Sequence, residues 1–238
     1  MNEEGDEGVS DERRLDMGRW GAWVRDGSEL WDVVRRSLSV FTLNTNELID
    51  VLNRPRADPA LAIRLLNDDA GEETLPFWDE LDQRLHNQLS SAVSLIDHTR
   101  RLLNYYEADF PTLVADHEAR NATIREMNET AFLRDLRNYL LHYGAAPVMQ
   151  SIRLGTSEGS AIGYSVKLSP RRLLEWDKWS PTSRTYLSSF PARDGPVLGQ
   201  DVAVYATAMS RVFTELLNQR RVIMDGGSKL DRFLSNGG

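Results

Sequence analysis

The chain has no cysteine in its 238 residues, and this absence excludes disulfides, thiolate metal sites and a cysteine nucleophile. Because secreted proteins often carry disulfides, it also favours a reducing compartment, and we expect a cytoplasmic protein. The first residues are acidic and lack an apolar core region, so we expect no signal peptide. No apolar run approaches the length of a membrane span, so we expect no membrane association.

Lysine is nearly absent as well, since only three of the 28 basic residues are lysines. An arginine-rich chain suits phosphate recognition, because guanidinium binds phosphate oxygens in pairs. The composition alone is better explained by the codon usage of a GC-rich genome. The net charge of -8 argues against a broad nucleic-acid-binding face but leaves a local basic pocket open.

The common nucleotide-binding signatures and the zinc-protease signature are missing. There is no GxGxxG, no GxxxxGK[ST] and no HExxH. The four histidines, at positions 86, 98, 117 and 142, are far apart in the sequence. We therefore expect neither a metal site nor a cofactor.

The two ends of the chain differ in composition from the rest. Residues 1–16 hold seven acidic and two basic side chains, and 1–17 carry little apolar surface, so we expect a disordered acidic tail. Residues 226–238 begin with two glycines and are expected to fray. Between them we expect one mostly helical domain over 18–225.

Apolar residues at steps of three and four predict helices along most of this domain. Ser28 is a candidate N-cap for a first helix, and Asn44 or Thr45 for a short second one. The segment 53–59, with two prolines, should end that helix. Further N-caps followed by a first-turn proline are predicted at Asp58-Pro59, Ser169-Pro170 and Ser180-Pro181.

The longest predicted helix covers about 78–106, and others cover 113–127, 129–143 and 200–223. The stripe of the longest one contains Leu81, Leu85, Leu89, Ala92, Ile96, Thr99 and Leu103. Alternation of apolar and polar residues around a Gly/Ser-rich segment predicts a β-hairpin at about 149–168. The expected fold is therefore mostly α, a helical bundle with one small hairpin.

The helix expected at 129–143 carries the residues that suggest chemistry. Its apolar side chains form one stripe. Arg137 and His142 are roughly 140° apart around the axis, so one straight helix does not hold them together, whereas two copies related by a two-fold axis bring both around one cleft. We therefore expect a homodimer in which Leu141 is buried against the partner. The side opposite the apolar stripe holds Arg134, Asp135, Arg137, Asn138, Leu141 and His142.

Arg137, Asn138 and His142 resemble the Rx4–6H motif of HEPN domains, in which the residue after the arginine is commonly Asn, Asp or His. The resemblance covers the motif and the helical core at about 78–147, and together with the run from Asp97 to Arg101 the pattern also resembles bacterial proteins. It implies a bundle of long antiparallel helices. It also implies a metal-independent endoribonuclease with its site at a dimer interface, or a non-catalytic RNA- or protein-binding relative.

The chemistry of these three residue types fits RNA cleavage. Histidine can move a proton near neutral pH, arginine can hold the charge on phosphorus, and Asn138 can orient either of them or the substrate. The structural alternative pairs Arg137 with Asp135 or Glu129 and bonds His142 to a carbonyl oxygen near the helix end.

Other residues are secondary candidates. Arg134, Arg171 and Arg172 are assigned to substrate binding, although the last two are better explained as surface charges. The adjacent Asp97 and His98 could support His142 but are better explained by a solvated helix face. The tryptophan pair at 176 and 179 could stack on bases, but packing against a neighbouring helix is the better interpretation.

Two functions follow from these patterns. The first is a HEPN-like, metal-independent endoribonuclease or RNA-binding protein, with Arg137, His142 and Asn138 as catalytic residues, in a bacterial defence or stress system. The second is a non-enzymatic helical protein that acts through a protein partner. The partners expected are RNA and a second copy of the chain.

Overall fold

The computed structural model describes residues 7–67, 71–153, 163–191 and 193–225. In these ranges the chain forms eight helices and one two-stranded antiparallel hairpin, which confirms the predicted mostly α fold. The buried apolar side chains make one cluster that runs from Trp31 to Ile223. None of the helices in these ranges is long and apolar enough to span a membrane.

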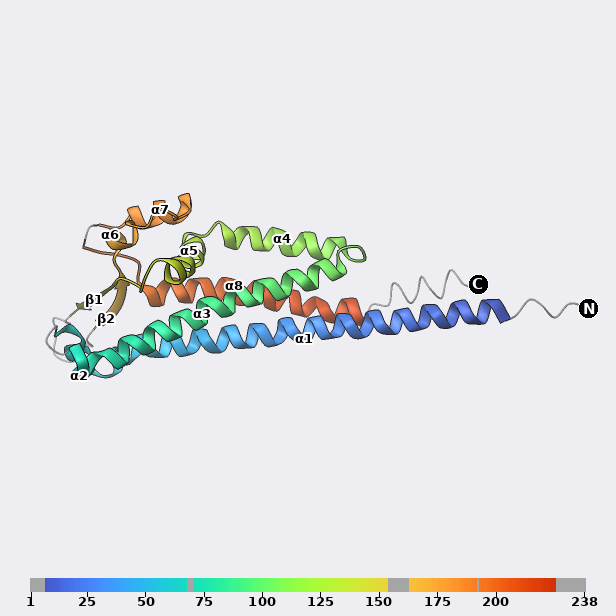
Figure 1. Ribbon diagram of the computed structural model, residues 1–238, viewed down its shortest axis with the longest axis horizontal. Coiled ribbons are helices and arrows are strands. Elements are labelled where there is room, and N and C mark those ends of the chain that lie inside the picture. Colours follow the sequence, from blue (N-terminus) through green and yellow to red (C-terminus); the bar gives the residue numbers. More distant parts are fainter. Residues whose placement is uncertain (1–6, 68–70, 154–162, 192, 226–238) are drawn as a thin grey trace, which may run out of the picture.

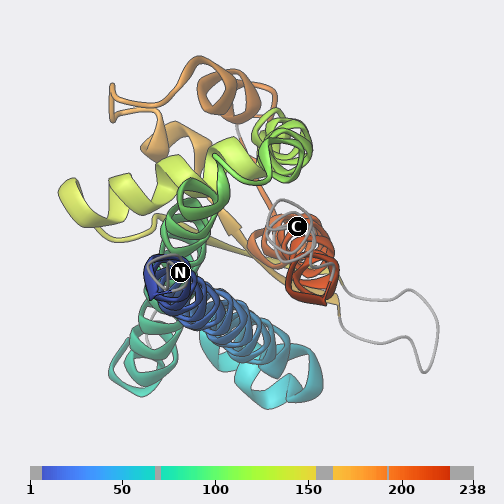
Figure 2. The same ribbon diagram turned by 90° about the vertical axis from the view of Figure 1, so that its right-hand side faces the viewer.

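Three long helices form the body of the molecule: α1 (Glu7–Ala57), α3 (Gly71–Tyr106) and α8 (Leu198–Asp225). Both α3 and α8 pack along α1, and Figures 1 and 2 show α4 to α7 on the side of the bundle away from α1. The stripe predicted for the long helix is confirmed on α3, where all its members are buried except the half-buried Ile96.

The first helix is longer than the sequence predicted. Ser28 and Asn44 lie inside α1 instead of capping it, and the Thr45 hydroxyl donates to the Phe41 carbonyl oxygen of the preceding turn at 2.9 Å. Pro55 is also inside α1, but only in its last turn, where a missing N–H interrupts little. Residues 7–17, predicted to be disordered, begin this helix, whereas 1–6 and 226–238 lie outside the described residues.

The short helices begin where the sequence indicated. α2 (Pro59–Leu66) is capped by Asp58, whose carboxylate accepts hydrogen bonds from the N–H groups of Ala60 and Leu61. α6 (Pro170–Leu173) and α7 (Pro181–Ser188) are capped by Ser169 and Ser180. Each cap places a side-chain oxygen on a backbone N–H that has no partner in the helix. α3 begins at Gly71, inside the polar segment that separates it from α2.

The predicted hairpin is present as β1 (Val148–Arg153) and β2 (Gly163–Leu168), with Val148 opposite Leu168. The segment 154–162 that connects the strands lies outside the described residues. On β2 the buried and half-buried positions alternate, as expected for a strand with one face on the core.

The next two helices are α4 (Pro111–Arg125), which begins at the predicted proline break, and α5 (Asn128–His142), which carries the motif residues. An aromatic cluster holds α5 against α6 and α7. Trp176 and Trp179 are both buried and meet edge to face with ring centroids 5.0 Å apart. Tyr139 stacks on Trp179 at 5.8 Å, and the Trp179 indole donates to the Leu173 carbonyl oxygen. The packing interpretation of the two tryptophans is confirmed.

Candidate functional site

The motif residues of α5 divide between solvent and the protein interior. Asn138 and His142 are exposed, and so is Arg134 one turn before Asn138. Leu141 on the same side is 48% exposed and Tyr143 is 52% exposed. Arg137 is instead half-buried, and its Nε is fully buried. The solvent side of α5 therefore presents polar groups around an exposed apolar leucine.

Arg137 lacks a partner that comparable arginines have. Three arginines with described side chains are partly buried, and two of them pair with carboxylates: Arg84 with Glu47 at 2.6 Å and Arg220 with Asp32 at 3.0 Å. In the described part of the chain Arg137 has neither an ion pair nor a hydrogen bond for Nε. A partly buried cation without a counter-charge is unfavourable, so its position calls for an anion.

The carboxylate considered as a structural partner of Arg137 is occupied elsewhere. Asp135 is buried and accepts hydrogen bonds from the Ser180 N–H at 2.9 Å and from the Ser183 hydroxyl at 2.7 Å. It therefore fixes the first turn of α7 on α5. The only arginine within ion-pair distance of Asp135 among the described residues is Arg134, at 3.6 Å. The alternative that pairs Arg137 with Asp135 is therefore wrong.

Arg137 lies on the wall of a cavity of about 290 Å³ between α3, α4, α5 and α8. The other arginines that line it are Arg100, Arg125 and Arg134, and the one acidic lining residue is Glu118, which accepts a hydrogen bond from Arg125 at 2.6 Å. Arg100 pairs with Asp97 and Arg134 lies 3.6 Å from Asp135, so Arg137 is the one lining arginine without an ion pair among the described residues. The apolar part of its wall consists of Leu89, Val93, Ile96, Leu103, Ile124, Leu133, Met209 and Phe213.

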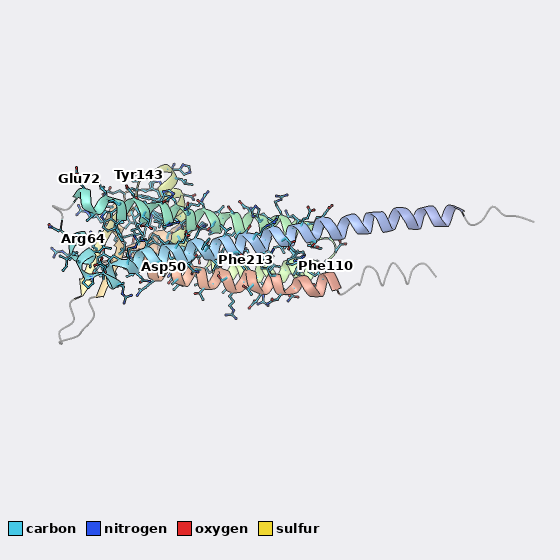
Figure 3. All side chains as sticks on the ribbon, turned by 90° about the horizontal axis from the view of Figure 1, so that it is seen from below. Asp50, Arg64, Glu72, Phe110, Tyr143 and Phe213 are labelled. Atoms are coloured by element: carbon cyan, nitrogen blue, oxygen red, sulfur yellow. The ribbon has the colours of Figure 1, made fainter. Side chains whose placement is uncertain are left out.

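Five neutral polar residues also line this cavity, and three of them have a buried atom without a partner among the described residues. These three are Thr99 of α3, His117 of α4 and Thr130 of α5, with the two hydroxyls and the His117 Nδ1 unbonded. Burial lowers the pKa of His117, and the guanidinium of Arg125 lowers it further despite the opposing effect of Glu118. Phe213, labelled in Figure 3, meets the His117 ring edge-on at 5.5 Å.

The sequence did not identify these three residues as functional. Thr99 carried a usable signal, because it is a polar residue within the apolar stripe of α3 and is 2% exposed. Thr130 and His117 carried none, since a threonine near a helix start and a lone histidine are both common. Only the packing of four helices brings them together.

His142 and the other predicted binding residues lie elsewhere. His142 does not line the cavity, and Figure 3 shows Tyr143, the next residue, toward the α2 end of the molecule and away from Phe213. Arg171 and Arg172 are exposed on α6 and do not line the cavity either. His98 bonds to the Ser37 hydroxyl of α1 at 2.6 Å through Nδ1, so it stabilises the contact between α3 and α1.

Among the described residues, no group of three or more His, Asp or Glu side chains is arranged to hold a metal ion. The site thus consists of the arginine-lined cavity and the neighbouring solvent face of α5. Comparisons of this chain with models of protein families, with curated protein sequences and with solved structures find no match.

Proposed function

We propose that this protein binds RNA at α5 and cleaves it without a metal, with Arg137, Asn138 and His142 as the catalytic residues, as in the HEPN-like proteins that the motif resembles. The observation that carries the proposal is the unpaired, half-buried guanidinium of Arg137. A phosphodiester would supply the missing counter-charge, and guanidinium binds phosphate oxygens in pairs. The exposed arginines Arg134, Arg171 and Arg172 extend the proposed RNA contact.

The proposed reaction is an internal transfer. His142 accepts the proton of the ribose 2′-hydroxyl, the 2′-oxygen attacks the adjacent phosphorus, and the bond from phosphorus to the 5′-oxygen breaks. A second protonated histidine or water gives a proton to the departing 5′-oxygen, leaving a 2′,3′-cyclic phosphate and a 5′-hydroxyl. Arg137 holds the charge on the phosphorane oxygens. Asn138, one turn before His142, orients the imidazole or the substrate.

A second copy of the chain completes this site. Within one chain His142 does not line the cavity that Arg137 lines, so one α5 cannot supply both groups to one phosphate at that cavity. Two copies of α5 related by a two-fold axis would cover the exposed side chains of Leu141 and Tyr143. Bacterial defence or stress is the biological setting that the resemblance favours.

Light scattering of the full chain at micromolar concentration is expected to give a dimer. Leu141→Glu, which places a charge at the proposed two-fold axis, should give a monomer and should also abolish cleavage. Val204→Glu is the matched control, because Val204 is an exposed apolar residue on α8. If the wild type is a monomer at micromolar concentration, the proposal that two copies of the chain share the site is wrong.

RNA cleavage is tested by incubating the purified protein with total RNA in the presence of EDTA. Cleavage is expected to persist, because no metal takes part. His142→Ala should abolish cleavage and keep binding, since a neutral imidazole contributes little to affinity. Arg137→Ala should weaken both, by about 1.5–3 kcal/mol in binding, because the guanidinium contacts phosphate in both states. Arg137→Lys should restore little of the binding or cleavage, because an ammonium is a point charge and cannot bond to two phosphate oxygens as a guanidinium does.

Arg101→Ala is the control for charge, because Arg101 is an exposed arginine of α3 outside the cavity. It should bind and cleave RNA like the wild type. If the wild type leaves RNA intact, or if the Arg137→Ala/His142→Ala double variant cleaves equally well, the enzyme proposal fails.

The second candidate function is a non-enzymatic helical protein that acts through a protein partner. The separation of His142 from the cavity within one chain favours it. It predicts that the exposed face of α5 is needed for partner binding, whereas His142→Ala leaves that binding unchanged. RNA that remains intact and unbound would make this the better description.

A further inference from the structure

Residues that line the cavity beside Arg137 hold several buried polar atoms that lack a hydrogen-bond partner. Among the described residues, nine buried side-chain nitrogen and oxygen atoms have no partner, and four of them belong to residues that line this one cavity. They are the hydroxyls of Thr99 and Thr130, Nδ1 of His117 and Nε of Arg137. Because native proteins leave few buried polar atoms unsatisfied, such a cluster calls for water or a ligand to complete the hydrogen bonds.

The charges around the cavity indicate the sign of the charge that the ligand carries. Four arginines line it, at positions 100, 125, 134 and 137, and Glu118 is the one carboxylate in its lining. Arg100 pairs with Asp97 and Arg134 lies 3.6 Å from Asp135, neither of which lines the cavity. Glu118 is already bonded to Arg125, and Arg137 has no ion pair within the described ranges. The unpaired guanidinium of Arg137 suits an oxyanion, and a phosphate group has further oxygens that can bond to a second arginine of the lining.

The neutral groups restrict the rest of the ligand. Thr99 and Thr130 are 2% and 6% exposed, and His117, whose pKa is lowered by burial, offers one donor and one acceptor nitrogen in its neutral form. An alkyl chain in this space would leave all three residues unsatisfied, so the cavity disfavours a lipid. Hydroxyl groups on the ligand would satisfy them. The volume of about 290 Å³ is at the low end for ligand pockets and limits the ligand to a small molecule.

We propose that this cavity binds a small phosphorylated sugar or polyol. The phosphate contacts Arg137 and the neighbouring arginines, and the ligand's hydroxyl groups bond to Thr99, Thr130 and His117. The apolar wall from α3 and α8 contacts the carbon skeleton. This site goes beyond the proposed action on RNA, because it needs neither RNA nor a second copy of the chain.

Calorimetric titration of the full chain tests the charge of the ligand. Inorganic phosphate is expected to bind saturably in the millimolar range, glucose 6-phosphate at least about tenfold more tightly, and glucose not at all. Arg137→Ala should abolish binding of both phosphates, and Arg101→Ala should bind them as the wild type does. If phosphate binding is absent, or survives Arg137→Ala unchanged, the proposal is overturned.

Near-isosteric replacement of the buried threonines tests the hydroxyl contacts. Thr99→Val and Thr130→Val should leave the melting temperature without ligand unchanged or higher, because each removes a buried hydroxyl that has no partner. Each should weaken the binding of glucose 6-phosphate about three- to tenfold and leave the affinity for inorganic phosphate unchanged. Thr45→Val is the matched control: its buried hydroxyl bonds to Phe41, so the variant should melt earlier and bind normally.

The opposite pattern at the threonines contradicts the proposal. If Thr99→Val and Thr130→Val lower the melting temperature as Thr45→Val does and leave the affinity for glucose 6-phosphate unchanged, the hydroxyls are structural. The RNA proposal has a separate readout, since these two variants should cleave RNA like the wild type.

Discussion

Asp201→Asn is expected to raise the free energy of unfolding at pH 8 by up to about 4 kcal/mol and to change it little at pH 4. Asp201, in the first turn of α8, is 5% exposed. Its Oδ1 accepts a hydrogen bond from the Tyr186 hydroxyl at 3.0 Å, and its Oδ2 has no partner among the described residues. Asparagine has the same shape and no charge, so it mimics the protonated acid.

The sign of this effect follows from the pKa of Asp201. Burial raises that pKa from its ordinary value to about 7, the hydrogen bond from Tyr186 opposes the rise, and Glu129 adds to it. The folded state therefore holds the proton over a pH range in which the unfolded chain, with a pKa of about 3.9, has lost it. The stabilising contribution is complete below about pH 4, declines as the pH rises toward 7, and is lost above that.

Urea unfolding of the wild type and the variant between pH 4 and pH 8 measures the effect, because other titrating groups cancel in the difference. Tyr186→Phe should steepen the pH dependence of stability, since it removes the hydrogen bond that stabilises the carboxylate. Asp97→Asn, at an exposed residue paired with Arg100, should follow the wild type. Parallel curves for the wild type and Asp201→Asn would show that Asp201 ionises normally.

Asp135→Ala is expected to lower the free energy of unfolding by about 3 kcal/mol or more. The carboxylate is buried and accepts two hydrogen bonds from the start of α7, and a hydrogen bond to a charged group contributes about 1.5–3 kcal/mol. Its loss leaves the Ser183 hydroxyl bonded only to Ser180 and removes the hydrogen bonds that fix the start of α7 on α5. In a chain of this size the melting temperature should fall by roughly 6–12 °C.

Thermal melts with matched variants measure this effect and locate its origin. Ser183→Ala removes one of the two bonds and should cost about half as much as Asp135→Ala. Asp97→Ala, at an exposed ion pair, should stay within about 0.5 kcal/mol of the wild type. Equal stability of Asp135→Ala and Asp97→Ala would show that α7 is held by its aromatic contacts alone.

The boundaries of α1 show where local sequence patterns stop being informative. N-caps followed by proline were predicted at three positions and are present at all three, because the cap and the proline act within one turn. The N-caps without a proline, predicted at Ser28 and at Asn44 or Thr45, are not present. α1 packs along both α3 and α8, and this contact supports one continuous helix through residues that would also suit its ends.

The candidate site depends both on local sequence patterns and on how the helices pack. Arg137, Asn138 and His142 could be named from one helix and one motif, and the polar face of α5 could be derived from its periodicity. The sequence could not predict that Arg137 lacks a counter-charge, because the nearby carboxylate of Asp135 bonds to α7 instead. The partners of a charged group depend on which helices meet it, and the spacing along one helix does not contain this information.

The sequence by itself determined the mostly α fold, the buried stripe of α3, the hairpin and the caps of the short helices, because each depends on residues within a few turns of one another. Tertiary structure alone decided the cavity. Thr99, His117 and Thr130 belong to three different helices, and they line one cavity with the arginines only once α3, α4, α5 and α8 are packed. The relative rotation of those helices is set by their shared apolar core, and a one-dimensional pattern does not specify that rotation.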